Sequence, residues 1–213
     1  MLNAQVIDLT LPFSDGKRGV AYTPALNIDD DGFNTTTLNL YSHALTHMDA
    51  PKHFLKGAAG IETIPLGRCI GPAEVIDLTH KEPNSLMKVD DLLPDEHRVI
   101  AGGRVLLRTD WSTHADLEDY RTRFPRISLE LAHWFVSRGV WLVGVEAPSV
   151  ASLAQEHRAE LTDVHQTLLG ANIIIVEGLS NLDRLPPHIE FIAFPLNLPG
   201  CDGSPVRAVA RIN

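Results

Sequence analysis

Helical and strand patterns alternate along the second half of this chain, and this alternation constrains its fold more than any other feature. Ser128 is a suitable N-cap for a first helix, and Gly139 and Gly170 are suitable stops for the first and second helices. The helices are predicted over 128–137 and 161–169, and apolar strands over 140–145 and 173–176. Helix-then-strand units of this kind are typical of α/β proteins with parallel strand pairing.

The rest of the chain is richer in strands. They are predicted over 6–9, 35–41, 73–78, 105–109, 189–194 and 206–212. With 44% hydrophobic and 21% charged residues, the composition is ordinary for a globular protein. The sequence therefore predicts one α/β domain over residues 1–213, with a mixed β-sheet flanked by helices.

Residues 11–34 interrupt this pattern. They are rich in Gly, Pro, Asp and Asn, which predicts an irregular or hairpin arm. Such an arm is too polar to form its own core, so we expect it to pack on a partner subunit.

Charge and targeting signals narrow the classes of partner. The formal net charge of −9 disfavours nucleic acid, which requires a basic surface, so a small-molecule substrate is expected. The N-terminus lacks the pattern of a signal peptide, and no apolar run approaches the ~18 residues of a membrane span. The two cysteines, Cys69 and Cys201, form no CxxC motif, which fits a reducing compartment. The cytoplasm is the expected location, with no membrane association.

Four residues of ligand type gather between positions 43 and 53. They are His43, His47, Asp49 and His53, all at odd positions. On an extended backbone residues of one parity share a face, whereas on a helix Asp49 would point away from His43 and His47. Pro51 and the preceding strand favour the extended interpretation.

Two histidines and a carboxylate suit Zn²⁺, and also Mn²⁺ or Fe²⁺. Open coordination positions would make the site catalytic instead of structural. The alternative is a solvated, histidine-rich loop. Farther along the chain, Glu177 directly follows four apolar strand residues, where burial without a cation would be costly. In the alternative, Glu177 leaves the sheet into solvent and His165 packs on its helix.

The segment 43–53 resembles the cyclase family of metal-dependent hydrolases, which includes bacterial kynurenine formamidase and isatin hydrolase. The family signature is H-x-G-T-H-x-D-x-P-x-H, and every ligand-type position matches here, with Leu45 in place of the glycine. Glu146 similarly stands where the family has aspartate. Further segments that resemble the family are 6–10, 106–111, 138–149 and 202–208.

The resemblance implies a swivelling β/β/α-like fold and a divalent metal, Zn²⁺ with Mn²⁺ as the alternative. In two-metal members a downstream histidine and a glutamate twelve residues later complete the site, a spacing that His165 and Glu177 share. The resemblance implies a first metal on His43, His47, Asp49 and Glu177. A second would bind Asp49, His165 and Glu177. A single-metal version on His43, His47 and Asp49 also occurs, so one or two ions per chain are expected.

The predicted activity is hydrolysis of a C–N bond in a small formamide, cyclic imide or lactam. A bound divalent ion makes hydroxide available at neutral pH, and His53 is the candidate general base and then general acid. The counter-interpretation makes His53 a third histidine ligand. The family's habit implies a homodimer or homotetramer.

Relatives that act on N-formylkynurenine carry a tryptophan in the N-terminal arm, but no tryptophan precedes Trp111 here. Tyr22 or Phe33 could replace it. The alternatives are kynurenine formamidase proper, and a non-hydrolytic metal-dependent lyase or metal-binding protein on the same scaffold.

Overall fold

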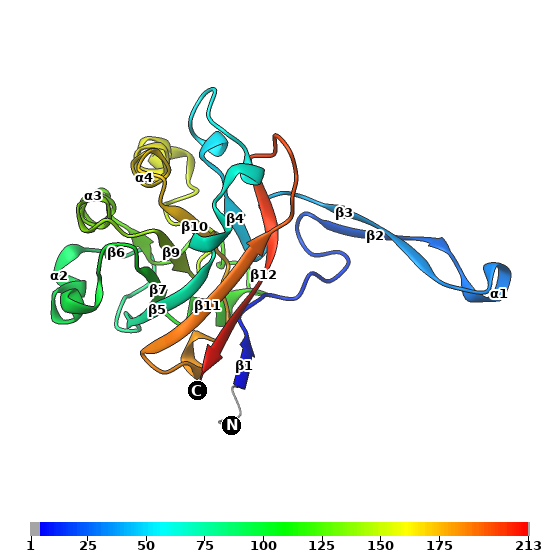
Figure 1. Cartoon of the computed structure of the whole chain (residues 1–213), viewed down its shortest axis with the longest axis horizontal. Helices are drawn as coiled ribbons and strands as arrows, with labels where there is room; N and C mark the ends of the chain where they lie inside the picture. Colours follow the sequence, from blue (N-terminus) through cyan, green and yellow to red (C-terminus); the bar gives the residue numbers. More distant parts are fainter. Residues whose placement is uncertain (1–4, 213) are drawn as a thin grey trace.

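A mixed eight-stranded sheet forms the body of the protein, as seen in a computed structural model that describes residues 5–212 (Figure 1). Its strands are β1 (Gln5–Asp8), β4 (His47–Asp49), β5 (Ile70–Asp77), β7 (Arg104–Arg108), β9 (Leu142–Val145), β10 (Ile174–Glu177), β11 (His188–Pro195) and β12 (Gly203–Ile212). Their order is β1-β12-β11-β5-β7-β9-β10-β4. The pairs β5–β7, β7–β9 and β9–β10 are parallel, and the others are antiparallel. The predicted mixed α/β sheet is confirmed.

The short strand β4 closes this sheet on itself. It pairs with β10 along one edge and with β12 along the other, and both pairings are antiparallel. The strands from β12 to β4 in this order are thereby joined into a ring, and β1 pairs with β12 outside it. The ring carries the segment predicted to bind metal at its point of closure.

Apolar side chains fill both faces of the central strands. On β10, Ile174 and Val176 belong to one buried cluster and Ile175 belongs to the other. Because successive side chains alternate between faces, a strand buried on both faces must be apolar throughout. This requirement explains the uninterrupted apolar run that precedes Glu177.

The two long helices, α3 (Leu129–Arg138) and α4 (Arg158–Gly170), cover one face of the sheet (Figure 1). As predicted, Ser128 caps α3 by accepting a hydrogen bond from the Leu131 N–H, and Gly139 ends it in the left-handed conformation. The helix predicted over 161–169 is shorter than α4, which begins at Arg158 and includes Gly170 as its last residue. A short helix α2 (Val89–Leu92) and a pair of two-residue strands, β6 (Leu86–Met87) and β8 (Arg126–Ile127), lie beside α3. Within residues 5–212, no helix combines the length and apolar character needed to cross a membrane.

A two-stranded ribbon projects from the body (Figure 1). It consists of β2 (Val20–Leu26), the one-turn helix α1 (Ile28–Asp31) and β3 (Thr35–Leu40). The strand predicted over 35–41 therefore exists but belongs to this arm and not to the main sheet. The predicted arm also begins too early, because Leu11 is buried and its N–H donates to the Thr46 hydroxyl.

Candidate metal centre

The register between β4 and β10 brings together residues that lie far apart in the sequence. Glu177 lies opposite His47, and Ile175 lies opposite Asp49. Since opposite residues share a face, the side chains of His47, Asp49 and Glu177 project together toward α4. The His47 Nε2 lies 3.2 Å from Glu177 Oε2 and 3.5 Å from Asp49 Oδ1.

His165 reaches the same place from α4. It lies on the buried face of the helix with Leu161 and Leu169, as the i, i+4 spacing requires. Its Nε2 is 3.5 Å from Glu177 Oε1 and 3.8 Å from Asp49 Oδ2. The structure thus joins the two downstream residues to the group near position 47.

Backbone carbonyls orient two of the imidazoles. The Nδ1 of His47 lies 2.9 Å from the Leu45 oxygen, and the Nδ1 of His165 lies 2.7 Å from the Leu161 oxygen. Since a carbonyl only accepts, each Nδ1 carries the proton and donates it. In the neutral ring the Nε2 lone pair then faces the two carboxylates, which is the arrangement that metal-bound histidines use.

His43 and His53 complete the cluster from outside the strand. The extended backbone predicted for the whole motif holds only over His47–Asp49, because His43 lies in a turn and His53 ends a 3₁₀ helix, Pro51–His53. Pro51 stops the strand, as predicted, and the same turn of 3₁₀ helix carries His53 back over the site. The His43 and His53 rings stack with their centroids 3.8 Å apart.

Asp202 is a member of the cluster that the sequence interpretation did not assign. Its Oδ2 lies 3.1 Å from His43 Nε2 and 3.6 Å from His53 Nδ1, and its Oδ1 accepts from Ser42. It reaches the site because β12 pairs with β4, which sets Gly203 opposite Asp49. Its only sequence signal was its position in the segment 202–208 that resembles the family.

The cluster stabilises positive charge. Burial opposes protonation of His43, but Asp49 and Asp202 outweigh it and raise its pKa to about 9. Burial likewise opposes protonation of His165, and Glu177 and Asp49 raise its pKa. The pKa of Glu177 lies well below its usual range, because hydrogen bonds and charges from His165 and His47 exceed the effect of burial. His53 differs, since burial and the neighbouring charges of His43 and His165 lower its pKa.

The donor set fits a divalent ion. Ligand atoms of His47, Asp49 and Glu177 lie within 4.8 Å of one another, as do those of His43, Asp49 and His53. Asp49 belongs to both groups, and its buried Oδ2 has no hydrogen-bond partner among the described residues. A buried carboxylate oxygen without a donor is unfavourable unless a cation is present. The second group also places His53 within ligand reach, as the counter-interpretation expects.

A cavity of about 330 Å³ opens onto this cluster. His43, His47, His53, His165 and Glu177 all line it. Tyr41 and Phe54 contribute aromatic rings, and the Phe54 ring stacks on His165 with centroids 4.2 Å apart. The cavity therefore offers a small organic molecule both an apolar surface and direct access to the ligand-type residues.

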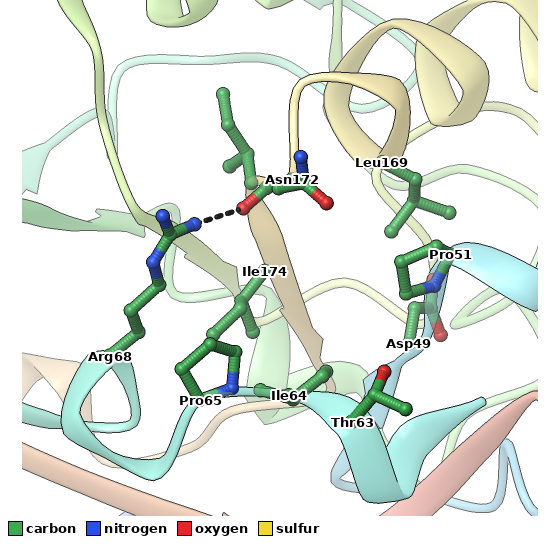
Figure 2. A pocket seen from close by; sticks show the side chains of 10 residues that line it. Asp49, Pro51, Thr63, Ile64, Pro65, Arg68, Leu169, Asn172 and Ile174 are labelled. Atoms are coloured by element: carbon green, nitrogen blue, oxygen red, sulfur yellow. Dashed lines mark hydrogen bonds between the residues drawn. The ribbon is translucent and has the colours of Figure 1, made fainter. Parts of the chain in front are cut away.

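A second cavity, of about 230 Å³, touches Asp49 but has a different character (Figure 2). Its lining combines apolar residues, among them Pro51, Ile64 and Ile174, with the polar residues Thr63 and Asn172. Its one cationic lining residue, Arg68, donates to the backbone oxygen of Asn172 (Figure 2). Lacking the histidines and Glu177, this cavity does not have the donor set found in the first.

Comparison with known proteins gives one family. The Cyclase family model matches residues 7–152. The chain is 32% identical to a kynurenine formamidase of Salinibacter ruber, covering 89% of this chain and 85% of that protein. This chain belongs to the cyclase family of metal-dependent hydrolases. It is also 37% identical to the kynurenine formamidase of Sphingopyxis alaskensis, over 79% and 76% of the two chains. The structure of isatin hydrolase A from Ralstonia solanacearum superposes with a TM-score of 0.86 at 27% identity, covering 99% and 93%.

The cyclase-family match includes His43, His47, Asp49 and His53, whereas His165, Glu177 and Asp202 lie beyond it. The structure also explains the glycine of the cyclase-family signature. Leu45, which replaces it, has φ 50°, a left-handed conformation that costs a non-glycine residue about 1–2 kcal/mol. The turn at this position brings the rings of His43 and His47 edge to face, with their centroids 5.0 Å apart.

Proposed function

We propose that this chain is a metal-dependent hydrolase that cleaves a C–N bond of a small formamide, cyclic imide or lactam. The observation that carries the proposal is the convergence of His47, Asp49, His165 and Glu177 on one buried point beside a cavity. The names of the kynurenine formamidase and isatin hydrolase relatives support the bond type.

His43, His47, Asp49, His165 and Glu177 would hold the metal. Mixed imidazole and carboxylate ligands suit Zn²⁺, with Mn²⁺ as the alternative. The two overlapping donor groups that share Asp49 support one or two ions per chain. Once bound, a divalent ion at this position supplies a water of lowered pKa and polarises a carbonyl group.

His53 has the properties of the proton-transfer residue. It lines the cavity, its side chain is 26% exposed, and its lowered pKa keeps the ring neutral at pH 7. A neutral imidazole can accept a proton from the attacking water and return it to the leaving nitrogen, which an amide requires. Asp202, 3.6 Å from the His53 Nδ1, would stabilise the protonated ring between these two steps.

The arrangement of aromatic residues bears on the substrate. Tyr22 lines a separate cavity near β12, and Phe33 lies in the arm, so neither lies at the site in its own chain. Tyr41 and Phe54 are the aromatic residues that line the site cavity. They would contact an aromatic ring of the substrate. A formanilide or a fused lactam such as isatin therefore fits the proposal, and kynurenine formamidase proper remains the alternative.

The test is hydrolysis by protein whose metal content is known. Elemental analysis of protein purified without added metal would report the ion and its number per chain. Turnover of N-formylkynurenine, formanilide and isatin would then be followed by acid release in a pH-stat, before and after chelation. Stoichiometric acid release that disappears with the metal supports hydrolysis. Substrate consumption without acid release would indicate a lyase, and metal without turnover would indicate a binding protein.

We further propose that the arm joins two copies of this chain in a homodimer or homotetramer. Ile28, Phe33 and Leu38 are 59%, 54% and 56% exposed, and the ribbon projects away from its own body (Figure 1). Covering such residues with a second copy would bury apolar surface. Light scattering should give a multiple of 23.4 kDa, and Phe33→Asp with Leu38→Asp should reduce it to the monomer mass. A monomeric wild type would contradict this proposal.

We also place the enzyme in the cytoplasm, supported by Cys69 and Cys201, both of which are free thiols.

A further inference from the structure

Three arginines line the cavity that contains the ligand-type residues. They are Arg18, before β2, Arg121, in the loop before β8, and Arg158, the first residue of α4. A neighbouring cavity of about 180 Å³ is also lined by Arg18 and Arg121, together with His43 and His47. Arg18 and Arg121 thus lie together where the two cavities meet, beside the candidate metal centre.

These arginines have no partners in the described part of the chain. Arg98, Arg126 and Arg207 each form ion pairs with carboxylates, and Arg104 donates to backbone oxygens. Among residues 5–212, by contrast, no carboxylate lies within 4.0 Å of Arg18, Arg121 or Arg158. The cavity is therefore lined by guanidinium groups that are free to donate.

Arg121 is the most informative of the three because it is half-buried. Burial, and then the charge of Arg18, lower its pKa from the ordinary arginine value. Two like charges held close together, one of them partly removed from water, are unfavourable unless an anion joins them. Both arginines line the cavity of the candidate metal centre, so an anion bound in this cavity would lie beside both guanidinium groups.

We propose that the substrate carries a carboxylate that Arg121 and Arg18 bind while its C–N bond lies at the metal centre. This inference rests on the proposed function and narrows its substrate class to anionic amides. The guanidinium fork matches a carboxylate in two parallel hydrogen bonds, which would fix the orientation of the bound molecule as well as its affinity.

The test compares two substrates that differ only in charge. 2-Formamidobenzoate carries a carboxylate beside its formamide, and its methyl ester does not. Arg121→Gln should lower kcat/KM for the acid by ~10-fold, mainly through KM, and Arg18→Gln with Arg121→Gln by ~100-fold. The ester should change less than ~3-fold. Arg123→Gln is the matched control, since Arg123 is exposed and lies 3.8 Å from Asp119.

A binding measurement separates this inference from the proposed activity. 2-Aminobenzoate is a fluorescent aryl carboxylate whose binding to the metal-loaded protein can be titrated without turnover. Binding that is lost in the double arginine variant, at unchanged metal content and fold, supports the anion site even if neither formamide is cleaved. Equal effects of the arginine variants on acid and ester, or binding that persists unchanged in the double variant, would overturn the proposal.

Discussion

Asp202 Oδ2 lies 3.1 Å from the Nε2 of His43, on the side of the ring opposite Asp49. The side chain of Asp202 is anchored in turn by the Ser42 hydroxyl. Removing a carboxylate that orients a metal-bound histidine typically changes metal affinity by about 10–100-fold. We therefore predict that Asp202→Asn weakens Zn²⁺ affinity within this range, measured by competition with a chromogenic chelator. Asp183→Asn, an exposed carboxylate away from the site, is the control, and equal affinities in both variants would contradict the role.

His53→Ala should lose about 10²–10⁴-fold in kcat and keep its metal, because it removes proton transfer and leaves the other ligand-type residues in place. Turnover of formanilide and metal per chain, measured on the same preparation, test the two halves of the statement. His133→Ala, on the exposed face of α3, provides the comparison. A parallel loss of metal would instead make His53 a ligand within the group it forms with His43 and Asp49.

Glu177→Gln should abolish stable metal binding while the protein still folds. The amide oxygen can keep the 2.8 Å hydrogen bond from the Val150 N–H, but it lacks the negative charge that faces His47 and His165. Elemental analysis and circular dichroism together check this outcome. Glu190→Gln is a suitable control because Glu190 pairs with Arg211 on β12. Full metal content in Glu177→Gln would remove Glu177 from the ligand set.

Once a chelator has removed any metal, the free energy of unfolding of the protein should fall as the pH rises from 6.5 to 9. The pKa of His43 is about 9 in the folded chain, compared with 6.5 for an unperturbed histidine in the unfolded chain. The folded state therefore holds this proton more tightly. The resulting stabilisation is complete below pH 6.5 and is lost as the pH rises through 9. The raised pKa of His165 acts in the same direction, whereas His53, with its lowered pKa, acts only below pH 6.5.

Urea midpoints of chelated protein at pH 6.5, 7.5 and 9 would measure this fall. His43→Gln should flatten the profile, since it removes the group whose raised pKa sets this pH range. If the urea midpoint of the metal-free wild type stays level or rises with pH, the neighbouring carboxylates do not raise the pKa values of His43 and His165.

Gly178→Ala should destabilise the protein by about 3 kcal/mol. A Cβ at this position would lie 2.3 Å from the Leu45 backbone oxygen, and Gly178 has φ 68°. Gly170→Ala is a matched control, because a Cβ there meets nothing within 4 Å and the residue lies in α4. It should be neutral or stabilising by up to about 1 kcal/mol. Similar denaturation midpoints for the two variants would mean that the backbone at Leu45, before β4, can move away from Gly178, after β10, at little cost.

Local signals in the sequence were sufficient for part of this architecture. The caps at Ser128 and Gly139 and the apolar strand before Glu177 act over a few residues, so helix α3 and strand β10 could be predicted. Strand 35–41 could not be assigned to its sheet, because an exposed ribbon and a sheet edge require the same alternating, β-branched pattern.

The candidate site divides in the same way. His47 and Asp49 share a face by alternation, which the sequence shows directly. His165 and Glu177 were predicted through the family spacing, and only the β4–β10 register explains why they meet the first group. Asp202 went unassigned since its approach depends on β12 pairing with β4, a contact across more than 150 residues that leaves no local pattern.

Strand β4 has only three residues, yet it completes the ring by bonding to β10 and β12. Two of those three residues are His47 and Asp49, and the carboxylate they face belongs to β10. An ion held there would therefore fasten the two margins of the sheet to each other through side chains as well as through the backbone. Resistance to proteolysis and catalytic competence would then depend on the same short segment, so that a protein stripped of its metal would become easier to digest at the moment it became inactive.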